Sequence, residues 1–175
     1  MRKTTILPWK EDWIKQYDKE EKILKNIFKD ELLGIYHIGS TSIPSIGFAK
    51  PIVDILIVVK DIEKVDLYNE NMLSLGYDPR GENGISRRRY FSKSKEKRTH
   101  HVHIYQVGNE NIRIHLDFKE YLIKFPEDAK SYGEFKIKLA RQFPNDIHKY
   151  QDYKQDFVNE LVKKAMNWSS LRQRK

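Results

Sequence analysis

The fold is most clearly indicated by residues 36–59, YHIGSTSIPSIGFAKPIVDILIVV, where a short apolar run ends in a Gly-Ser turn and a longer apolar run follows. Gly39 has no side chain, so the backbone there tolerates unusual φ angles and allows a ligand to come close. Ser40 and Thr41 supply hydroxyl and N–H groups at the expected start of a helix, where anions are favoured. Asp54 is the one acidic residue of the second apolar run, and a lone carboxylate there requires a partner or a metal. A phosphate-binding turn followed by a buried carboxylate indicates nucleotide chemistry.

The composition is that of a globular protein. The chain has 175 residues, of which 39% are hydrophobic and 33% charged, and we expect one domain over residues 1–175. It has no cysteine, which excludes disulfides and thiolate metal sites. Any metal must therefore bind to Asp, Glu, His or backbone oxygen atoms. No signal peptide or membrane-spanning run is visible, so we expect a cytoplasmic protein without membrane contact.

The net charge of +8 is concentrated in residues 80–98 and 172–175. Such an excess attracts anions, and nucleic acid is one candidate partner. The sequence contains none of the usual nucleic-acid-binding motifs. We therefore interpret most of the excess as solvated surface charge.

Hydrophobic spacing and turn residues predict an α+β domain, in which helices flank a small mixed β-sheet and further helices lie at the C-terminus. Helices are expected at residues 9–30, 61–76, 126–143 and 146–168. Strands are expected at 36–39, 52–59 and 89–92, with a hairpin formed by 100–107 and 112–118. The aromatic residues of the C-terminal helices, Tyr132 and Tyr150 among them, are expected in the core without a chemical role.

A group of histidines suggests a second functional feature. His101 and His103 share one face of the strand expected at 100–107, and His115 and Asp117 are placed on its hairpin partner. If the first of these strands lies beside the strand at 52–59, His101 and His103 face Asp54. A mixed site of this kind suits Zn, Mn or Fe. The alternative is a set of polar strand residues on a solvated sheet surface.

The segment 79–89 is expected to be irregular and basic. Glycines at positions 81 and 84 indicate turns with positive φ, and the planar side chains of Arg88 and Arg89 suit bidentate contacts to phosphate. We interpret this segment as a lid over an anionic ligand, with an exposed basic loop as the alternative. Glu82 is a candidate metal ligand or general base, or else the ion-pair partner of a neighbouring arginine.

The order of these motifs resembles a known superfamily and a known family. The Gly-Ser turn, with thirteen residues between Ser40 and Asp54, resembles that of the nucleotidyltransferases, in which such a turn holds the triphosphate and an Asp-x-Asp on the next strand holds two metal ions. Almost the whole chain is similar to the GrpB family of small bacterial proteins, through LPWKEDWIKQY, HIGSTSIPSIGFAKPIVDILIVV, RGENGISRRRYF, THHVHIY and FKEYLIKFPEDAKSYGEFKIKLARQF. That family is grouped with nucleotidyltransferases by fold, and in some bacteria a domain of it is fused to dephospho-CoA kinase.

The resemblance implies a nucleotide or another phosphorylated small molecule as ligand, and nucleotidyl transfer with a divalent metal, Mg or Mn or alternatively Zn. Together with the residue chemistry above, it predicts ligand binding by Gly39, Ser40, Thr41, Lys50, Arg88 and Arg89. The residues predicted to act in catalysis are Asp54, Glu82 and His103, and the candidate metal ligands are Asp54, His101 and His103. His37, directly before the turn, is expected to orient the phosphate loop.

One position departs from the nucleotidyltransferase pattern. Residue 56 shares a strand face with Asp54, and it is Leu56 where the pattern has a second aspartate. A single carboxylate does not clamp two divalent ions about 4 Å apart, and Asp54 then has Lys50, Arg80 or the arginines at 87–89 as alternative partners. The sequence therefore leaves catalysis open. The alternatives are a catalytically inactive ligand-binding or accessory module in CoA or nucleotide metabolism, a tRNA-associated protein, and a metal-dependent hydrolase built on the histidines.

Overall fold

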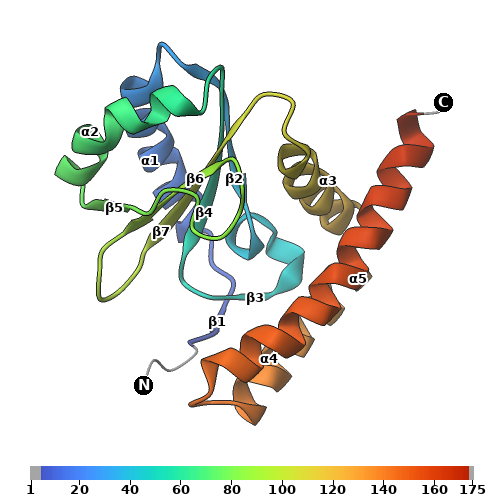
Figure 1. Ribbon diagram of the computed structural model, residues 1–175. Helices are drawn as coiled ribbons and strands as arrows, with labels where there is room; N and C mark the ends of the chain where they lie inside the picture. The colour runs from blue at the N-terminus through green and yellow to red at the C-terminus, as the bar shows by residue number, and fades with distance from the viewer. Residues whose placement is uncertain (1–4, 174–175) are drawn as a thin grey trace.

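The computed structural model describes residues 5–173, so the first four residues and the end of the basic tail lie outside the described part of the chain. At its centre is a five-stranded sheet with the strand order β2-β4-β7-β6-β5, with helices on both faces (Figure 1). Its strands are β2 (Leu32–Ile38), β4 (Val53–Val59), β5 (Tyr77–Pro79), β6 (Arg88–Lys93) and β7 (His100–Gln106). This is the predicted α+β class with a mixed sheet.

The parallel pair β4–β7 lies at the middle of the sheet, and the other pairs are antiparallel. In this register Asp54 is opposite His101 and Leu56 is opposite His103. Because side chains two residues apart point to the same face, the histidines and Asp54 share one face, as the sequence predicted. A short pair, β1 (Leu7–Pro8) with β3 (Phe48–Ala49), forms a separate two-stranded sheet.

One face of the sheet is covered by α1 (Asp12–Phe28), the 3-10 helix η3 (Glu63–Tyr68) and α2 (Asn69–Ser74). Alternate β4 residues from Val53 to Val59 pack here in a core with Trp13, Leu24, Phe28 and Met72. The helix predicted at 9–30 is confirmed. The helix predicted at 61–76 is instead divided between a 3-10 segment and the short α2.

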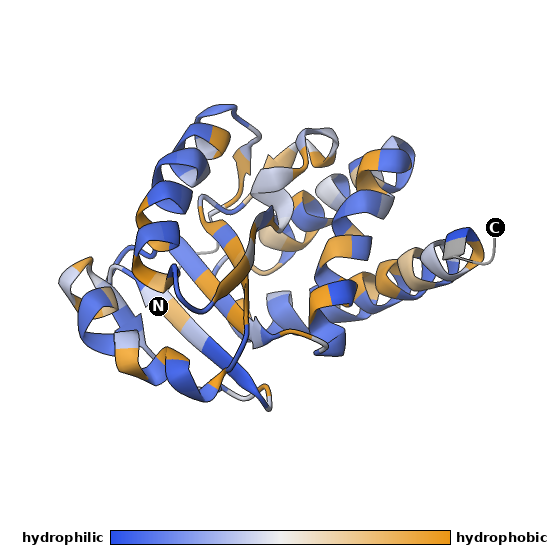
Figure 2. Ribbon diagram, turned by 90° about the horizontal axis from the view of Figure 1, so that it is seen from above, coloured by the Kyte–Doolittle hydropathy of each residue, from blue (hydrophilic) through white to orange (hydrophobic). Residues whose placement is uncertain are grey.

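The other face is covered by α3 (Glu110–Lys124), and α4 (Pro126–Gln142) and α5 (Ile147–Gln173) pack beyond it (Figure 1). Hydrophobic and hydrophilic residues alternate along these helices in Figure 2, as expected for helices with one packed and one exposed side. Both predicted C-terminal helices are confirmed, and the last extends beyond its predicted end. None of the helices in the described residues is long and apolar enough to cross a membrane.

The predicted hairpin is wrong, because residues 112–118 belong to helix α3. Asn109 caps this helix by accepting a hydrogen bond of 3.0 Å from the N–H of Asn111. Ile112 and Leu116, four residues apart, pack against Leu56 and its neighbours on the sheet. The segment alternates in polarity, but the same residues also satisfy helical spacing. As a result, His115 and Asp117 lie on a helix rather than on a partner strand.

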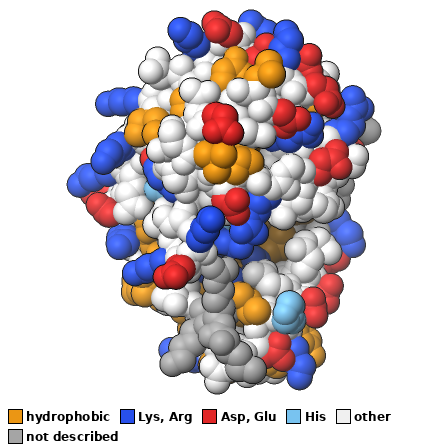
Figure 3. All heavy atoms as spheres, turned by 60° about the vertical axis from the view of Figure 1, so that its left-hand side comes forward, with side chains coloured by type: hydrophobic (Ala, Val, Ile, Leu, Met, Phe, Trp, Pro, Cys, Tyr) orange, Lys and Arg blue, Asp and Glu red, His pale blue; other side chains and the backbone are white. Residues whose placement is uncertain are grey.

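The surface charge is mixed. On the face shown in Figure 3, Lys and Arg side chains are interspersed with Asp and Glu. The positive excess is therefore not gathered into one continuous basic patch on that face.

Candidate functional site

The Gly-Ser turn follows directly from the end of β2. Gly39 has φ +71°, a backbone conformation that L side chains rarely adopt. A Cβ atom at this position would lie 2.8 Å from Oδ2 of Asp54. Glycine is therefore required both by the backbone conformation and by the close approach of the turn to the carboxylate. Ser40 and Thr41 follow in the 3-10 helix η1 (Ser40–Ser42).

Contacts of His37, Tyr17 and Lys119 hold the turn in place. His37 Nε2 lies 3.0 Å from the Thr41 hydroxyl oxygen, and the Tyr17 ring stacks on the His37 ring with centroids 4.7 Å apart. Lys119 Nζ donates to the His37 carbonyl at 2.7 Å. Burial, reinforced by the charge of Lys119, lowers the pKa of His37 to about 4. His37 is thus a neutral ring that orients the turn, in agreement with its expected position.

Asp54 forms the acidic part of the site. His103 Nε2 lies 3.1 Å and His101 Nδ1 lies 3.4 Å from the same oxygen, Oδ1 of Asp54. Burial raises the pKa of Asp54, but hydrogen bonds from His101 and His103 outweigh it and hold this pKa well below its usual range. The neighbours of the carboxylate are therefore the two histidines, not Lys50 or an arginine of the segment 79–89. His115, on α3, extends this group, since its ring centroid is 5.6 Å from that of His103.

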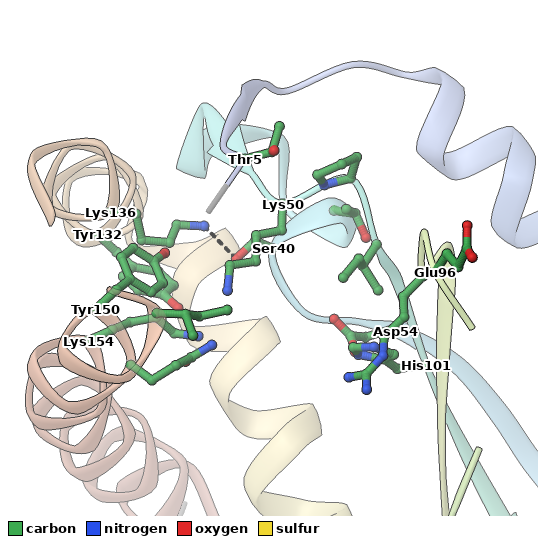
Figure 4. A pocket seen from close by; sticks show the side chains of 16 residues that line it. Thr5, Ser40, Lys50, Asp54, Glu96, His101, Tyr132, Lys136, Tyr150 and Lys154 are labelled. Carbon is green, nitrogen blue, oxygen red and sulfur yellow. Dashed lines mark hydrogen bonds and ion pairs between the residues drawn. The ribbon is translucent and has the colours of Figure 1, made fainter. Parts of the chain in front are cut away.

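A cavity of about 480 Å³ opens between this part of the sheet and helices α4 and α5. Figure 4 shows Asp54 and His101 on the sheet side, with Ser40 and Lys50 between them and the helices. Of the predicted site residues, the cavity is lined by Ser40, Thr41, Lys50, Asp54 and His101. The structure thus places the turn, the half-buried Asp54 carboxylate and one of the two histidines at the same cavity.

The helix side of the cavity carries two Tyr–Lys pairs, each four residues apart. Tyr132 and Lys136 come from α4, and Tyr150 and Lys154 come from α5. Residues at this spacing share one helix face, and all four point toward the cavity in Figure 4. Sequence reasoning placed these tyrosines in the core and missed both lysines. The repeated Tyr-x-x-x-Lys spacing was the available signal.

Three lysines meet at this cavity. Lys136 Nζ donates to the Ser40 hydroxyl at 2.8 Å, drawn as a dashed line in Figure 4, and to the Phe48 carbonyl at 2.7 Å. Burial, followed by the charges of Lys154 and Lys50, lowers the pKa of Lys136 to about 7. Burial likewise lowers the pKa of Lys50 to about 8 and lowers that of Lys154. The buried ammonium groups repel one another, so an anion in the cavity would stabilise all three.

The arginine segment lies elsewhere and satisfies its own hydrogen bonds. Arg88 is buried and donates to the carbonyls of Glu82 and Asn83 at 3.1 and 2.8 Å. Arg89 makes a bidentate contact to Asp66, with distances of 2.7 and 3.0 Å. The exposed Glu82 accepts from the backbone N–H of Arg87. None of Glu82, Arg88 and Arg89 is among the residues that line the cavity. In the described structure these side chains stabilise the segment and anchor it to η3.

The donor set does not fit a resident metal centre. The place of a second aspartate is occupied by Leu56, which is fully buried beneath α3. His101 and His103 both approach a single oxygen of Asp54, which is a hydrogen-bonding arrangement. Within residues 5–173, no group of three His, Asp or Glu side chains is placed so that it could hold a metal ion. The protein alone therefore does not supply the ligands that the two-metal pattern requires.

Comparison with known proteins places the chain in a family. The family model described as "GrpB protein" matches residues 3–164. The Bacillus subtilis protein YqkA is 46% identical over 95% of this chain, but the chain spans only about half of YqkA, 48%. Dephospho-CoA kinase of Mycobacterium leprae is 26% identical over 90% of this chain and 45% of its own length.

Two solved structures are similar to the chain. The crystal structure of the conserved protein GrpB from Enterococcus faecalis is 42% identical, with a TM-score of 0.84 over 91% of this chain and 98% of that one. The structure of Cid1 in complex with its short product ApU has a TM-score of 0.50 and 12% identity over 74% of this chain and 41% of that one. The likeness to Cid1 shows a nucleotidyltransferase-like fold and no more. The extent of the family match and the close structural agreement show that the chain belongs to the GrpB family.

Proposed function

We propose that this protein binds a nucleotide or another phosphorylated small molecule in the cavity between the Gly-Ser turn and helices α4 and α5. The observation that carries the proposal is the meeting of Lys50, Lys136 and Lys154 in one cavity, with Ser40 in contact with Lys136. The charge of Asp54 acts on all three ammonium groups, yet their pKa values remain lowered by burial, so keeping them partly buried is costly without a further anion. Phosphate groups have the charge and the acceptor oxygens that these donors lack.

A second candidate function is nucleotidyl transfer on the same site. It is favoured by the position of Asp54 and His101 at the wall of the same cavity, and by the nucleotidyltransferase-like fold. In that reaction an acceptor hydroxyl attacks the α-phosphorus of a nucleoside triphosphate and gives up its proton, and pyrophosphate leaves. Leu56 favours the binding module instead. For nucleotidyl transfer, a divalent metal (Mg, Mn or Zn) would have to bind together with the phosphates, so each metal is included with the ligands in the screen.

The test is a thermal-shift screen of the purified protein with ATP, GTP, CTP, UTP and dephospho-CoA, each with EDTA, Mg, Mn or Zn. A ligand at about 100 times its dissociation constant adds about 2.7 kcal/mol to the free energy of unfolding. We expect at least one of these ligands to stabilise the protein, and Ser40→Ala and Lys154→Met to reduce the shift. Absence of any shift across the panel would exclude these nucleotides and dephospho-CoA as the ligand.

The matched control is Lys163→Met on the same helix as Lys154. Lys163 is exposed and pairs with Glu160, so its removal should leave the shift unchanged. Pyrophosphate release, measured with the ligands that bind, then separates the two candidates. Release that is lost in Asp54→Asn supports nucleotidyl transfer, and binding without release supports the ligand-binding module.

A further inference from the structure

Three hydroxyl groups follow one another at the Gly-Ser turn, and two of them are used inside the protein. The Ser42 hydroxyl donates to the Gly39 carbonyl at 2.7 Å, and the Thr41 hydroxyl oxygen lies 3.0 Å from His37 Nε2. Thr41 and Ser42 are both buried. Ser40 is half-buried and lines the cavity, so it is the residue of the three that is best placed to contact a ligand.

Lys136 reaches Ser40 from helix α4 but is itself almost closed to a ligand. The residue is only 3% exposed, and its Nζ donates to the Ser40 hydroxyl at 2.8 Å and to the Phe48 carbonyl at 2.7 Å. The centre of the Tyr132 ring lies 4.7 Å from the same nitrogen. An ammonium group has three N–H donors, so two of them already have acceptors within the protein. Figure 4 shows the contact with Ser40 as a dashed line.

Close packing of α4 fixes the position of Lys136. Gly133 lies three residues before it, and a Cβ atom at Gly133 would be 1.7 Å from the Ile46 carbonyl oxygen. Residues three apart share one helix face. The close contact at Gly133 therefore holds the part of α4 that carries Lys136 against the chain segment between Ser40 and Phe48. The ammonium group has a defined place relative to the Ser40 oxygen.

The contact from Lys136 sets the direction of the Ser40 hydroxyl. An ammonium group only donates, so the Ser40 oxygen accepts in this contact and its own proton points elsewhere. The Tyr132 hydroxyl is a further hydrogen-bonding neighbour of Ser40, and a phenol both donates and accepts. A charged phosphate oxygen is a stronger acceptor than a phenol. With a phosphate in the cavity, the Ser40 proton therefore turns to the phosphate.

We infer that Lys136 is a positioning residue of the ligand site, which holds the Ser40 hydroxyl so that its proton is donated to a phosphate oxygen of the ligand. Lys50 and Lys154 are half-buried and line the same cavity, so these are the lysines that contact the phosphate. This inference rests on the proposed function and separates the roles of the three lysines. A direct contact from Lys136 would act independently of Ser40, whereas positioning makes the contribution of Ser40 depend on Lys136.

The experiment is a double-mutant cycle that measures binding of ATP, GTP, CTP, UTP and dephospho-CoA by isothermal titration calorimetry. It is carried out at pH 6.5, below the pKa of Lys136, which burial lowers to about 7. Ser40→Ala should weaken binding about tenfold in the otherwise wild-type protein, as for one hydrogen bond to a charged group. In the Lys136→Met background the hydroxyl is no longer directed, so Ser40→Ala should change the affinity by less than about twofold.

Two further backgrounds serve as controls. Lys154→Met removes a phosphate contact but leaves Lys136 in place, so Ser40→Ala should again weaken binding about tenfold. Lys138→Met removes an exposed lysine of the same helix as Lys136, and Ser40→Ala should have the same effect there. Each comparison is made between two proteins that share the background substitution, so a general loss of stability affects both alike. If Lys136→Met does not fold, Lys136→Gln takes its place, because glutamine keeps a polar end but is shorter and uncharged.

The outcomes separate this inference from the proposed function. If none of the five compounds binds the wild type, the proposed function fails and the inference falls with it. If a compound binds and Ser40→Ala weakens it equally with and without Lys136, the positioning role is overturned while the proposed function stands. Loss of the Ser40 effect in Lys154→Met as well would show that the coupling is not specific to Lys136, and it would also overturn the role.

Discussion

Binding of a phosphate ligand should be coupled to proton uptake by the buried lysines. The pKa of Lys136 is lowered to about 7 and that of Lys50 to about 8 in the free protein, so at pH 8 most Lys136 side chains are neutral. The negative charge of the ligand should keep both ammonium groups protonated in the complex. Affinity should therefore decline as the pH rises through these two values.

The size of the effect follows from the two pKa values. Binding requires that Lys136 and Lys50 are protonated. Between pH 7.5 and 8.5, this requirement lowers the affinity about eightfold for Lys136 and about threefold for Lys50, which together give about 25-fold. Phosphate groups complete their second ionisation near pH 6 and add little change in this interval. In Lys136→Met, the affinity should fall over the same interval only by the factor due to Lys50, about threefold.

Isothermal titration calorimetry at pH 8 in buffers of different ionisation heat measures the proton uptake directly. We expect uptake of about 1.4 protons by the wild type and about 0.5 by Lys136→Met. Lys163→Met, with its side chain on the surface, should behave as the wild type. An affinity that does not change between pH 7.5 and 8.5, or equal proton uptake by wild type and Lys136→Met, would refute this reasoning.

Three further predictions concern stability. Gly133→Ala should destabilise the protein by about 3 kcal/mol in urea unfolding despite the better helix propensity of alanine, because the new Cβ would lie 1.7 Å from the Ile46 carbonyl oxygen; equal or greater stability would contradict this packing. The free energy of unfolding should fall as the pH drops from about 6.5 to 4, since the folded protein holds His37 neutral with a pKa of about 4. Denaturant titrations of wild type and His37→Gln should differ in this slope by up to about 3 kcal/mol, and identical slopes would show that His37 is not responsible. Glu20→Ala should cost about 3 kcal/mol, because buried Glu20 accepts from Lys93 at 2.7 Å and its loss leaves that ammonium group without its partner; thermal unfolding that differs little from wild type would argue against a stabilising pair.

The part of the site that lies on the sheet was predictable, because strand geometry fixes it. Once β4 and β7 are neighbours, the period of two places Asp54, His101 and His103 on one face. Gly39 was identifiable for a similar reason, since the turn that follows β2 must pass close to the start of β4. In these cases a local rule and one pairing were enough to position the side chains.

The helix side was not predictable by the same means. Whether a lysine on an amphipathic helix faces water or a cavity depends on how the helices pack, and a local pattern does not contain that information. Lys136 and Lys154 resemble many solvated lysines in the sequence, yet α4 and α5 bring them to Ser40 and Lys50. The arginines of the segment 79–89 show the opposite error. The sequence suggested that they bind a ligand, but in the structure they donate to nearby carbonyls and to Asp66. Charge alone was a poor guide in both cases.

The position of Leu56 bears on whether catalysis is to be expected here. This side chain is not merely a missing carboxylate at the edge of the cavity, because it lies fully buried with Ile38 and Tyr105 beneath Ile112 and Leu116 of α3. A carboxylate introduced at this position would lose its hydration among apolar side chains. The fold has therefore closed the place where a second metal ligand would lie, while the cavity next to it remains lined with lysines. In the proposed function, phosphate binding depends on the lysines of the cavity and not on residue 56, so it is separable from two-metal catalysis on this scaffold.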